Sequence, residues 1–113
     1  MKLITLTQAS DYIRRDTNAD DTLLDSIVEG ASHAVLNYLK SGADSFLDSN
    51  GEVPVDSSGD PVGVPFVVQC ATMYLTSWLY RNRDMDEQKT FETGYLPPPV
   101  TAMLYALRDP ALA

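Results

Sequence analysis

The sequence contains a single histidine and a single cysteine, the two residue types that most often serve as metal ligands or nucleophiles. His33 follows Glu29 by four residues, and this spacing places both side chains on one helix face, where they could share a metal ion. Two ligands are too few for a protein metal site, and Cys70 lies in a separate apolar segment. We therefore interpret His33 and Glu29 as a solvated pair and Cys70 as an unreactive packing residue.

Two short segments, DSNGE at 48–52 and DSSGD at 56–60, place carboxylates beside a glycine, as calcium-binding loops do. They lack the alternating acidic order and the distal glutamate of an EF-hand loop, so we interpret them as turns. The sequence also has no glycine-rich phosphate loop, no HExxH and no nucleophile elbow. We therefore expect no catalytic residues, no metal and no cofactor, and a protein that is not an enzyme.

The composition restricts the class of protein. Acidic residues outnumber basic ones by 16 to 8, and the resulting net charge of -8 repels nucleic acid phosphates, which disfavours a protein that grips DNA. A chain of 113 residues predicts one domain over 1–113. No apolar run reaches the roughly 18 residues of a membrane span. The lone cysteine and the absence of a signal-like apolar stretch near Met1 predict a cytosolic compartment.

Apolar residues recur at helical spacing along most of the chain. We therefore predict an all-α domain, a small bundle of three to four helices. A first helix is predicted over 8–14 with Thr7 as its N-cap. A second, long helix is predicted with Asp20 or Asp21 as its N-cap, and Gly42, just after Lys40, is predicted as its left-handed stop. Residues 41–64, rich in Gly, Pro, Ser and Asp, predict a loop with a β-hairpin-like turn at 49–51. We interpret this long loop as a binding arm.

A third helix is predicted from Pro65 to about Arg83, and its circumference is mainly apolar, so we expect it to be buried almost all round. Its polar stripe comprises Gln69, Thr72, Thr76 and Arg83. A short fourth helix follows three prolines, and its apolar ridge comprises Val100, Met103, Leu104 and Leu107. Because so short a helix is marginal alone, it must pack on another element. We predict that 96–113 is a C-terminal docking segment.

The order of these parts resembles the head-tail connector, or adaptor, proteins of tailed bacteriophages. The resemblance covers most of the chain and rests on an ordered set of segments. A short helix ends in YIRRD at 12–16, a long helix opens with DDTLLDSIVEGAS at 20–32 and reaches VLNYL at 35–39, and after a variable loop come VPFVVQCATMYLTSWLYRNRD at 64–84 and LPPPVTAMLYALRDP at 96–110. In that family a proline opens the third helix, an apolar run ends in Tyr-x-x-Arg, and Leu-Pro precedes a closing helix that ends in arginine. The matching positions are Pro65, Ala71, Tyr80, Arg83, Leu96, Pro97, Leu104 and Arg108.

The resemblance implies a structural adaptor of the phage neck, located in the virion and assembled in the host cytoplasm. Twelve copies would form a ring below the portal that extends the DNA channel and joins the head to the tail or to a stopper. The implied partners are further copies of the chain, the portal protein and a stopper or tail-terminator protein. DNA would pass through the lumen without specific binding, because an acidic lumen repels phosphates.

The resemblance and the apolar helices together predict two sets of contact residues. The third helix is more apolar than short neighbours can cover, so we expect a subunit interface that includes Phe66, Met73, Tyr80 and Arg83. The residues predicted to dock on the portal are Pro97, Tyr105, Arg108 and Leu112. The alternatives are that the chain's own helices cover the third helix fully, and that the C-terminal residues fray or pack on their own subunit.

A second hypothesis comes from the charge alone. A small acidic protein can inhibit a nucleic-acid-binding partner by imitating the phosphate backbone. The two hypotheses differ in assembly state. An adaptor forms a closed ring, whereas an inhibitor binds one basic partner with strong salt dependence.

Overall fold

The computed structural model describes residues 1–13, 21–81 and 97–107. These residues form four α-helices, α1 (Leu6–Ile13), α2 (Asp21–Leu39), α3 (Phe66–Arg81) and α5 (Pro98–Leu104). Two short 3₁₀ helices, η1 (Lys40–Ser45) and η2 (Tyr105–Leu107), continue α2 and α5. The described part of the chain contains no β-strand, and the predicted all-α bundle is confirmed.

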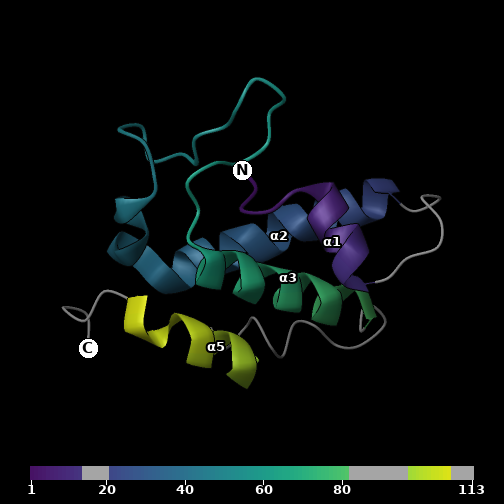
Figure 1. Cartoon of the computed structure of the whole chain (residues 1–113). Helices are drawn as coiled ribbons and strands as arrows, with labels where there is room; N and C mark the ends of the chain where they lie inside the picture. The colour runs from purple at the N-terminus through teal and green to yellow at the C-terminus, as the bar shows by residue number, and fades with distance from the viewer. Residues whose placement is uncertain (14–20, 82–96, 108–113) are drawn as a thin grey trace.

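Helix α3 lies at the centre of the bundle and contacts α1, α2 and α5 (Figure 1). Both α2 and α5 run antiparallel to α3. As a result, η1, the start of α3 and η2 lie toward one end of the bundle, while the end of α1, the start of α2 and the end of α3 lie toward the other. This arrangement decides which side chains of different helices share a surface.

The buried residues form two clusters. The larger one joins α2, α3 and α5, and includes Val35, Leu75 and Leu104, none of which has any exposed surface. The apolar ridge of the fourth helix is confirmed, since Val100 and Leu104 are fully buried and the other two ridge residues pack against the cluster. The smaller cluster lies under α1 and comprises Ile4, Ala9, Leu24 and Val28.

The first helix begins earlier than predicted, at Leu6, and its N-cap is Thr5, so the assignment of Thr7 is wrong. The Gln8 N–H donates to Thr5 Oγ1 over 3.0 Å, and the Thr5 N–H donates to Gln8 Oε1 over 2.9 Å. This reciprocal capping box needs Gln or Glu three residues after the cap, which Thr5 has and Thr7 lacks.

The second helix ends at Leu39, and the left-handed residue is Lys40, with φ of 53°, so the prediction for Gly42 is wrong. The chain then continues as η1 instead of turning away from the bundle. Ala43 and Phe46 become buried in the larger cluster, and this burial holds η1 against the core.

The loop that follows contains two tight turns of the same geometry. Asp48 Oδ1 accepts the N–H groups of Asn50 and Glu52, and Asp56 Oδ1 accepts those of Ser58 and Asp60, over 2.8 to 3.1 Å. The hairpin-like pairing closes the second turn through an isolated antiparallel bridge between residues 55 and 61, whereas we predicted it around 49–51. The first turn has no such bridge.

Two of the four residues in the polar stripe of α3 are buried. Thr72 and Thr76 are fully buried, while Phe66 and Val67 at the start of the helix are exposed. Thr72 can be buried because its Oγ1 donates to the Val68 carbonyl over 2.8 Å. The Thr76 hydroxyl has no hydrogen-bond partner among the described residues. The expectation that α3 is buried almost all round is therefore wrong for its first turn.

Candidate functional site

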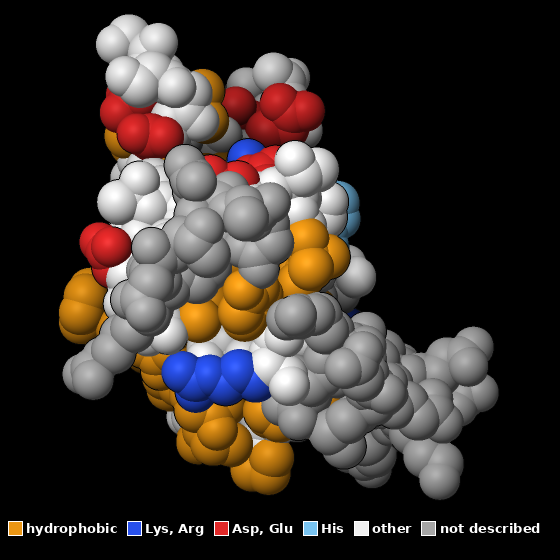
Figure 2. Space-filling model, turned by 90° about the vertical axis from the view of Figure 1, so that its right-hand side faces the viewer, with side chains coloured by type: hydrophobic (Ala, Val, Ile, Leu, Met, Phe, Trp, Pro, Cys, Tyr) orange, Lys and Arg blue, Asp and Glu red, His pale blue; other side chains and the backbone are white. Residues whose placement is uncertain are grey.

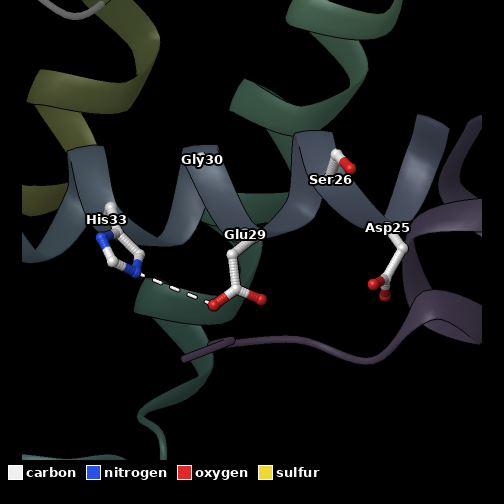
Figure 3. A pocket seen from close by; sticks show the side chains of 5 residues that line it. All are labelled: Asp25, Ser26, Glu29, Gly30 and His33. Atoms are coloured by element: carbon white, nitrogen blue, oxygen red, sulfur yellow. Dashed lines mark ion pairs between the residues drawn. The ribbon is translucent and has the colours of Figure 1, made fainter. Parts of the chain in front are cut away.

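The outer face of α2 carries an open depression lined by Asp25, Ser26, Glu29, Gly30 and His33. Figure 3 shows that all five lie on this one helix, with Asp25 and Glu29 pointing toward the N-terminal segment. The two carboxylates contact cations there, the Met1 amino group at Glu29 and Lys2 Nζ at Asp25. His33 Nε2 lies 3.8 Å from Glu29 Oε1. The cations of the N-terminal segment thus offset the negative charge of the two carboxylates.

The histidine pair lies on α2 and the cysteine on α3. Among the residues placed in the structure, no group of three or more His, Cys, Asp or Glu side chains is close enough to hold a metal ion. Cys70 is a half-buried free thiol on α3.

The N-terminal segment positions the loop that carries the two acidic turns. The Leu3 N–H donates to Ser32 Oγ over 2.9 Å in the buried interior, and the Val53 N–H contacts Met1 Sδ at 3.3 Å. Residues 1–5 therefore connect α2 to the loop. The loop begins after Phe46 and ends before Val64, both buried, so the two turns between them are held at their bases.

The acidic turns project from the bundle and are visible as two groups of red side chains at the top of Figure 2. Their carboxylates, on Asp48, Glu52, Asp56 and Asp60, belong to exposed residues. One oxygen of each turn's first aspartate already accepts two backbone N–H groups. The turns therefore present negative charge to solvent, which repels phosphates.

The predicted interface residues lie in two different environments. Phe66 is 76% exposed and begins α3. Met73 and Tyr80 are half-buried and pack against the small cluster under α1. Arg83 lies outside the described residues. Phe66 is thus exposed to solvent, whereas Met73 and Tyr80 already make contacts within the subunit.

The residues predicted to dock on the portal also differ in exposure. Tyr105 is 73% exposed at the start of η2. Pro97 is buried, and its carbonyl accepts the Val100 and Thr101 N–H groups over 2.9 and 3.2 Å, so it starts α5. Arg108 and Leu112 lie outside the described part of the chain. Any effect of Pro97 on docking is therefore exerted through the direction of α5.

Phe66 and Tyr105 belong to elements that meet at the same end of the bundle, because α5 runs antiparallel to α3 (Figure 1). Sequence reasoning assigned these two aromatics to different interfaces, and it missed Val67, which is also exposed at this end. The clearest candidate site is therefore an exposed aromatic end of the bundle, built from the first turn of α3 and from η2.

Comparison with known families gives one match. A family model described as "Phage gp6-like head-tail connector protein" matches residues 3–108. No curated protein and no solved structure shows a significant match. Within residues 1–13, 21–81 and 97–107, no helix combines the length and apolarity that crossing a membrane requires.

Proposed function

The chain belongs to the phage gp6-like head-tail connector family, and from this premise we propose that twelve copies form a ring below the portal of a tailed phage. The family gives it a structural role in the phage neck, between portal and tail proteins. The ring extends the DNA channel and joins the head to the tail or to a stopper protein. The chain performs no catalysis in this role.

The exposure of Phe66 and Tyr105 at one end of the bundle carries this proposal. Exposure of two large aromatic side chains to water is unfavourable, because removing apolar surface from water lowers the free energy by about 25 cal/mol per Å². Among the residues that the structure describes, the core leaves them uncovered, because α3 is already packed against α1, α2 and α5. Contact with other proteins of the neck would bury them, and aromatic residues are typical anchors of such contacts.

Portal docking is proposed for the C-terminal segment, with Pro97, Tyr105, Arg108 and Leu112 as its residues. Val100 and Leu104 hold α5 on α3 from the buried side, which leaves Tyr105 outside. Because the backbone of α5 is already fixed in this way, Tyr105 would lose little further conformational entropy on binding the portal.

The acidic side chains are proposed to face the channel. The net charge of -8 and the four exposed carboxylates of the two turns support a lumen that repels phosphates. DNA then slides past without being held, as ejection requires. A ring whose acidic residues face outward around a basic lumen would contradict this part of the proposal.

Electron microscopy of the purified chain mixed with its portal protein tests the whole proposal. We expect a closed twelve-fold ring seated below the portal with a continuous axial channel. A chain that leaves the portal bare and instead binds one basic partner, with an affinity that falls steeply as salt is raised, would replace the adaptor with the charge-mimicking inhibitor.

A further inference from the structure

The first acidic turn, at 48–52, contains the one Asn-Gly pair of the chain. Asn50 precedes Gly51, whereas the other three asparagines precede alanine, tyrosine or arginine. In an Asn-Gly pair the backbone nitrogen of the glycine can approach the side-chain carbonyl carbon of the asparagine without steric hindrance, because glycine has no Cβ. Attack of that nitrogen on that carbon is the first step of asparagine deamidation, which needs no enzyme.

The structure leaves this pair accessible to water. Asn50 and Gly51 are both exposed, in a loop that projects from the helices (Figure 1). A Cβ added at Gly51 would have no heavy atom within 4 Å, so the space beside the glycine is open. The Asn50 side chain can therefore move toward the Gly51 nitrogen, and water can reach the product of the attack.

The same turn restrains the attacking nitrogen through hydrogen bonds. The Gly51 N–H donates to the Asp48 carbonyl over 3.0 Å, and the Asn50 N–H donates to Asp48 Oδ1 over 2.8 Å. The Gly51 nitrogen must leave its bond before it attacks. An exposed turn opens locally at a small cost in free energy, because few buried contacts hold it. The turn therefore slows the reaction relative to an unfolded chain but does not prevent it.

We propose that Asn50 is a site of spontaneous deamidation in the folded protein. After hydroxide removes its proton, the Gly51 nitrogen attacks Asn50 Cγ, and a C–N bond forms. The Cγ–Nδ2 bond then breaks, and the side-chain amide takes a proton from water and leaves as ammonia. The resulting succinimide ring is opened by water at either carbonyl carbon, which gives aspartate or isoaspartate. One water is consumed, one ammonia is released, and no atom is oxidised or reduced.

The products change both the charge and the geometry of the turn. The new carboxyl group is ionised at neutral pH, so the turn carries three carboxylates in place of those of Asp48 and Glu52. In isoaspartate the backbone runs through the side chain and is longer by one methylene group. Asp48 Oδ1 can then no longer accept both the residue 50 and the Glu52 N–H groups as it does in the structure. The modification needs no partner, and it does not depend on the proposed ring.

Ageing of the full-length folded protein tests the proposal. The chain is incubated at neutral and at mildly alkaline pH and then digested, and mass spectrometry of the peptides detects the replacement of the amide by a carboxyl group. We expect conversion at Asn50, faster at the higher pH because the nitrogen must lose its proton. Asn37 is also exposed but lies within α2 before Tyr38, and it should stay intact. Asn50→Ser places the serine of the second turn at this position and should abolish the modification.

The two turns provide a matched pair of variants, once circular dichroism has shown that each variant folds. Asp48→Ala removes the acceptor of two N–H groups and should accelerate conversion at least about fivefold, the factor that corresponds to the net contribution of one hydrogen bond. Asp56→Ala makes the same change in the second turn and should leave the rate at Asn50 unchanged. The proposal is overturned if Asn50 stays intact in the folded protein while the chain unfolded in guanidinium is converted, or if Asn37 reacts as fast. Equal rates in both aspartate variants would overturn the restraint by the turn.

Discussion

Gln8 on α1 donates a hydrogen bond from Nε2 to Oε1 of Gln69 on α3, over 3.0 Å. Gln69 Nε2 donates in turn to the Val64 carbonyl over 2.8 Å, and Gln8 Oε1 accepts the Thr5 N–H. Both side-chain amides thus act as donor and acceptor, which fixes their orientation. These bonds link the start of α1, the first half of α3 and the end of the acidic loop.

A double-mutant cycle measures this link. Gln8→Ala and Gln69→Ala each lower the free energy of unfolding, and we expect a coupling energy of about 1 kcal/mol between them, the usual net contribution of one partly buried hydrogen bond. Urea unfolding of the wild type, both single variants and the double variant gives the four values. Additive effects, within about 0.3 kcal/mol, would show that the two amides act independently.

The N-cap of α1 allows a comparison of two neighbouring threonines. Thr5→Ala removes the acceptor for the Gln8 N–H and is expected to lower stability by about 1 kcal/mol. Thr7→Ala, within the exposed first turn, should change it by less than about 0.5 kcal/mol. Thermal unfolding of both variants measures the difference. A larger loss for Thr7→Ala would place the cap two residues later than the structure has it.

The positions of the helices were predictable from the sequence because burial imposes a period on it. The ridge from Val100 to Leu107 and the apolar face of α2 were both found in this way. Helix ends were less predictable, because several neighbouring residues could serve as the cap or the last residue of each helix. Gln8, three residues after Thr5, was the signal in the sequence that Thr5 is the N-cap of α1. No neighbouring residue indicated that Lys40 rather than Gly42 would adopt the left-handed conformation, because the end of α2 depends on the burial of Ala43 and Phe46.

The buried threonines of α3 provide the third prediction. Thr76 Oγ1 has no hydrogen-bond partner in the part of the chain that the structure describes. Thr76→Val therefore removes an unsatisfied polar group at nearly constant volume and should raise the free energy of unfolding by about 1 kcal/mol. Thr72→Val is the matched control one helical turn away. It removes the hydrogen bond to the Val68 carbonyl and should bring no gain. Equal effects of the two substitutions on urea unfolding would mean that the Thr76 hydroxyl is satisfied in solution.

Two glycines should respond in opposite directions to alanine. Gly30 lies inside α2 with nothing within 4 Å of an added Cβ, so Gly30→Ala should stabilise the protein by about 0.5 to 1 kcal/mol through helix propensity. Gly59 has φ of +84° in the second acidic turn, where alanine is strained, so Gly59→Ala should destabilise it by about 1 kcal/mol. Calorimetric melting of the two variants checks both signs. A stabilising Gly59→Ala would contradict the turn geometry.

The candidate site was less predictable than the fold. The sequence marks Phe66 and Tyr105 as large aromatics near helix ends, but only the antiparallel packing of α5 on α3 brings those ends together. Met73 and Tyr80 share the apolar character of Phe66, yet they pack under α1, a contact between residues far apart in the sequence. The roles assigned to Arg83, Arg108 and Leu112 stay predictions, because these residues lie outside the described ranges.

Leu104 and Tyr105 are adjacent, and their substitution should separate folding from docking. Leu104 is fully buried against α3, so Leu104→Ala should lower the free energy of unfolding by about 2 to 5 kcal/mol. Tyr105 is exposed, so Tyr105→Ala should leave unfolding almost unchanged and weaken attachment to portal, because an exposed anchor contributes only when a partner covers it. Urea unfolding and co-sedimentation with portal measure the two effects. If Tyr105→Ala binds portal as the wild type does, the docking role proposed for this side chain is wrong, whatever the stability of Leu104→Ala.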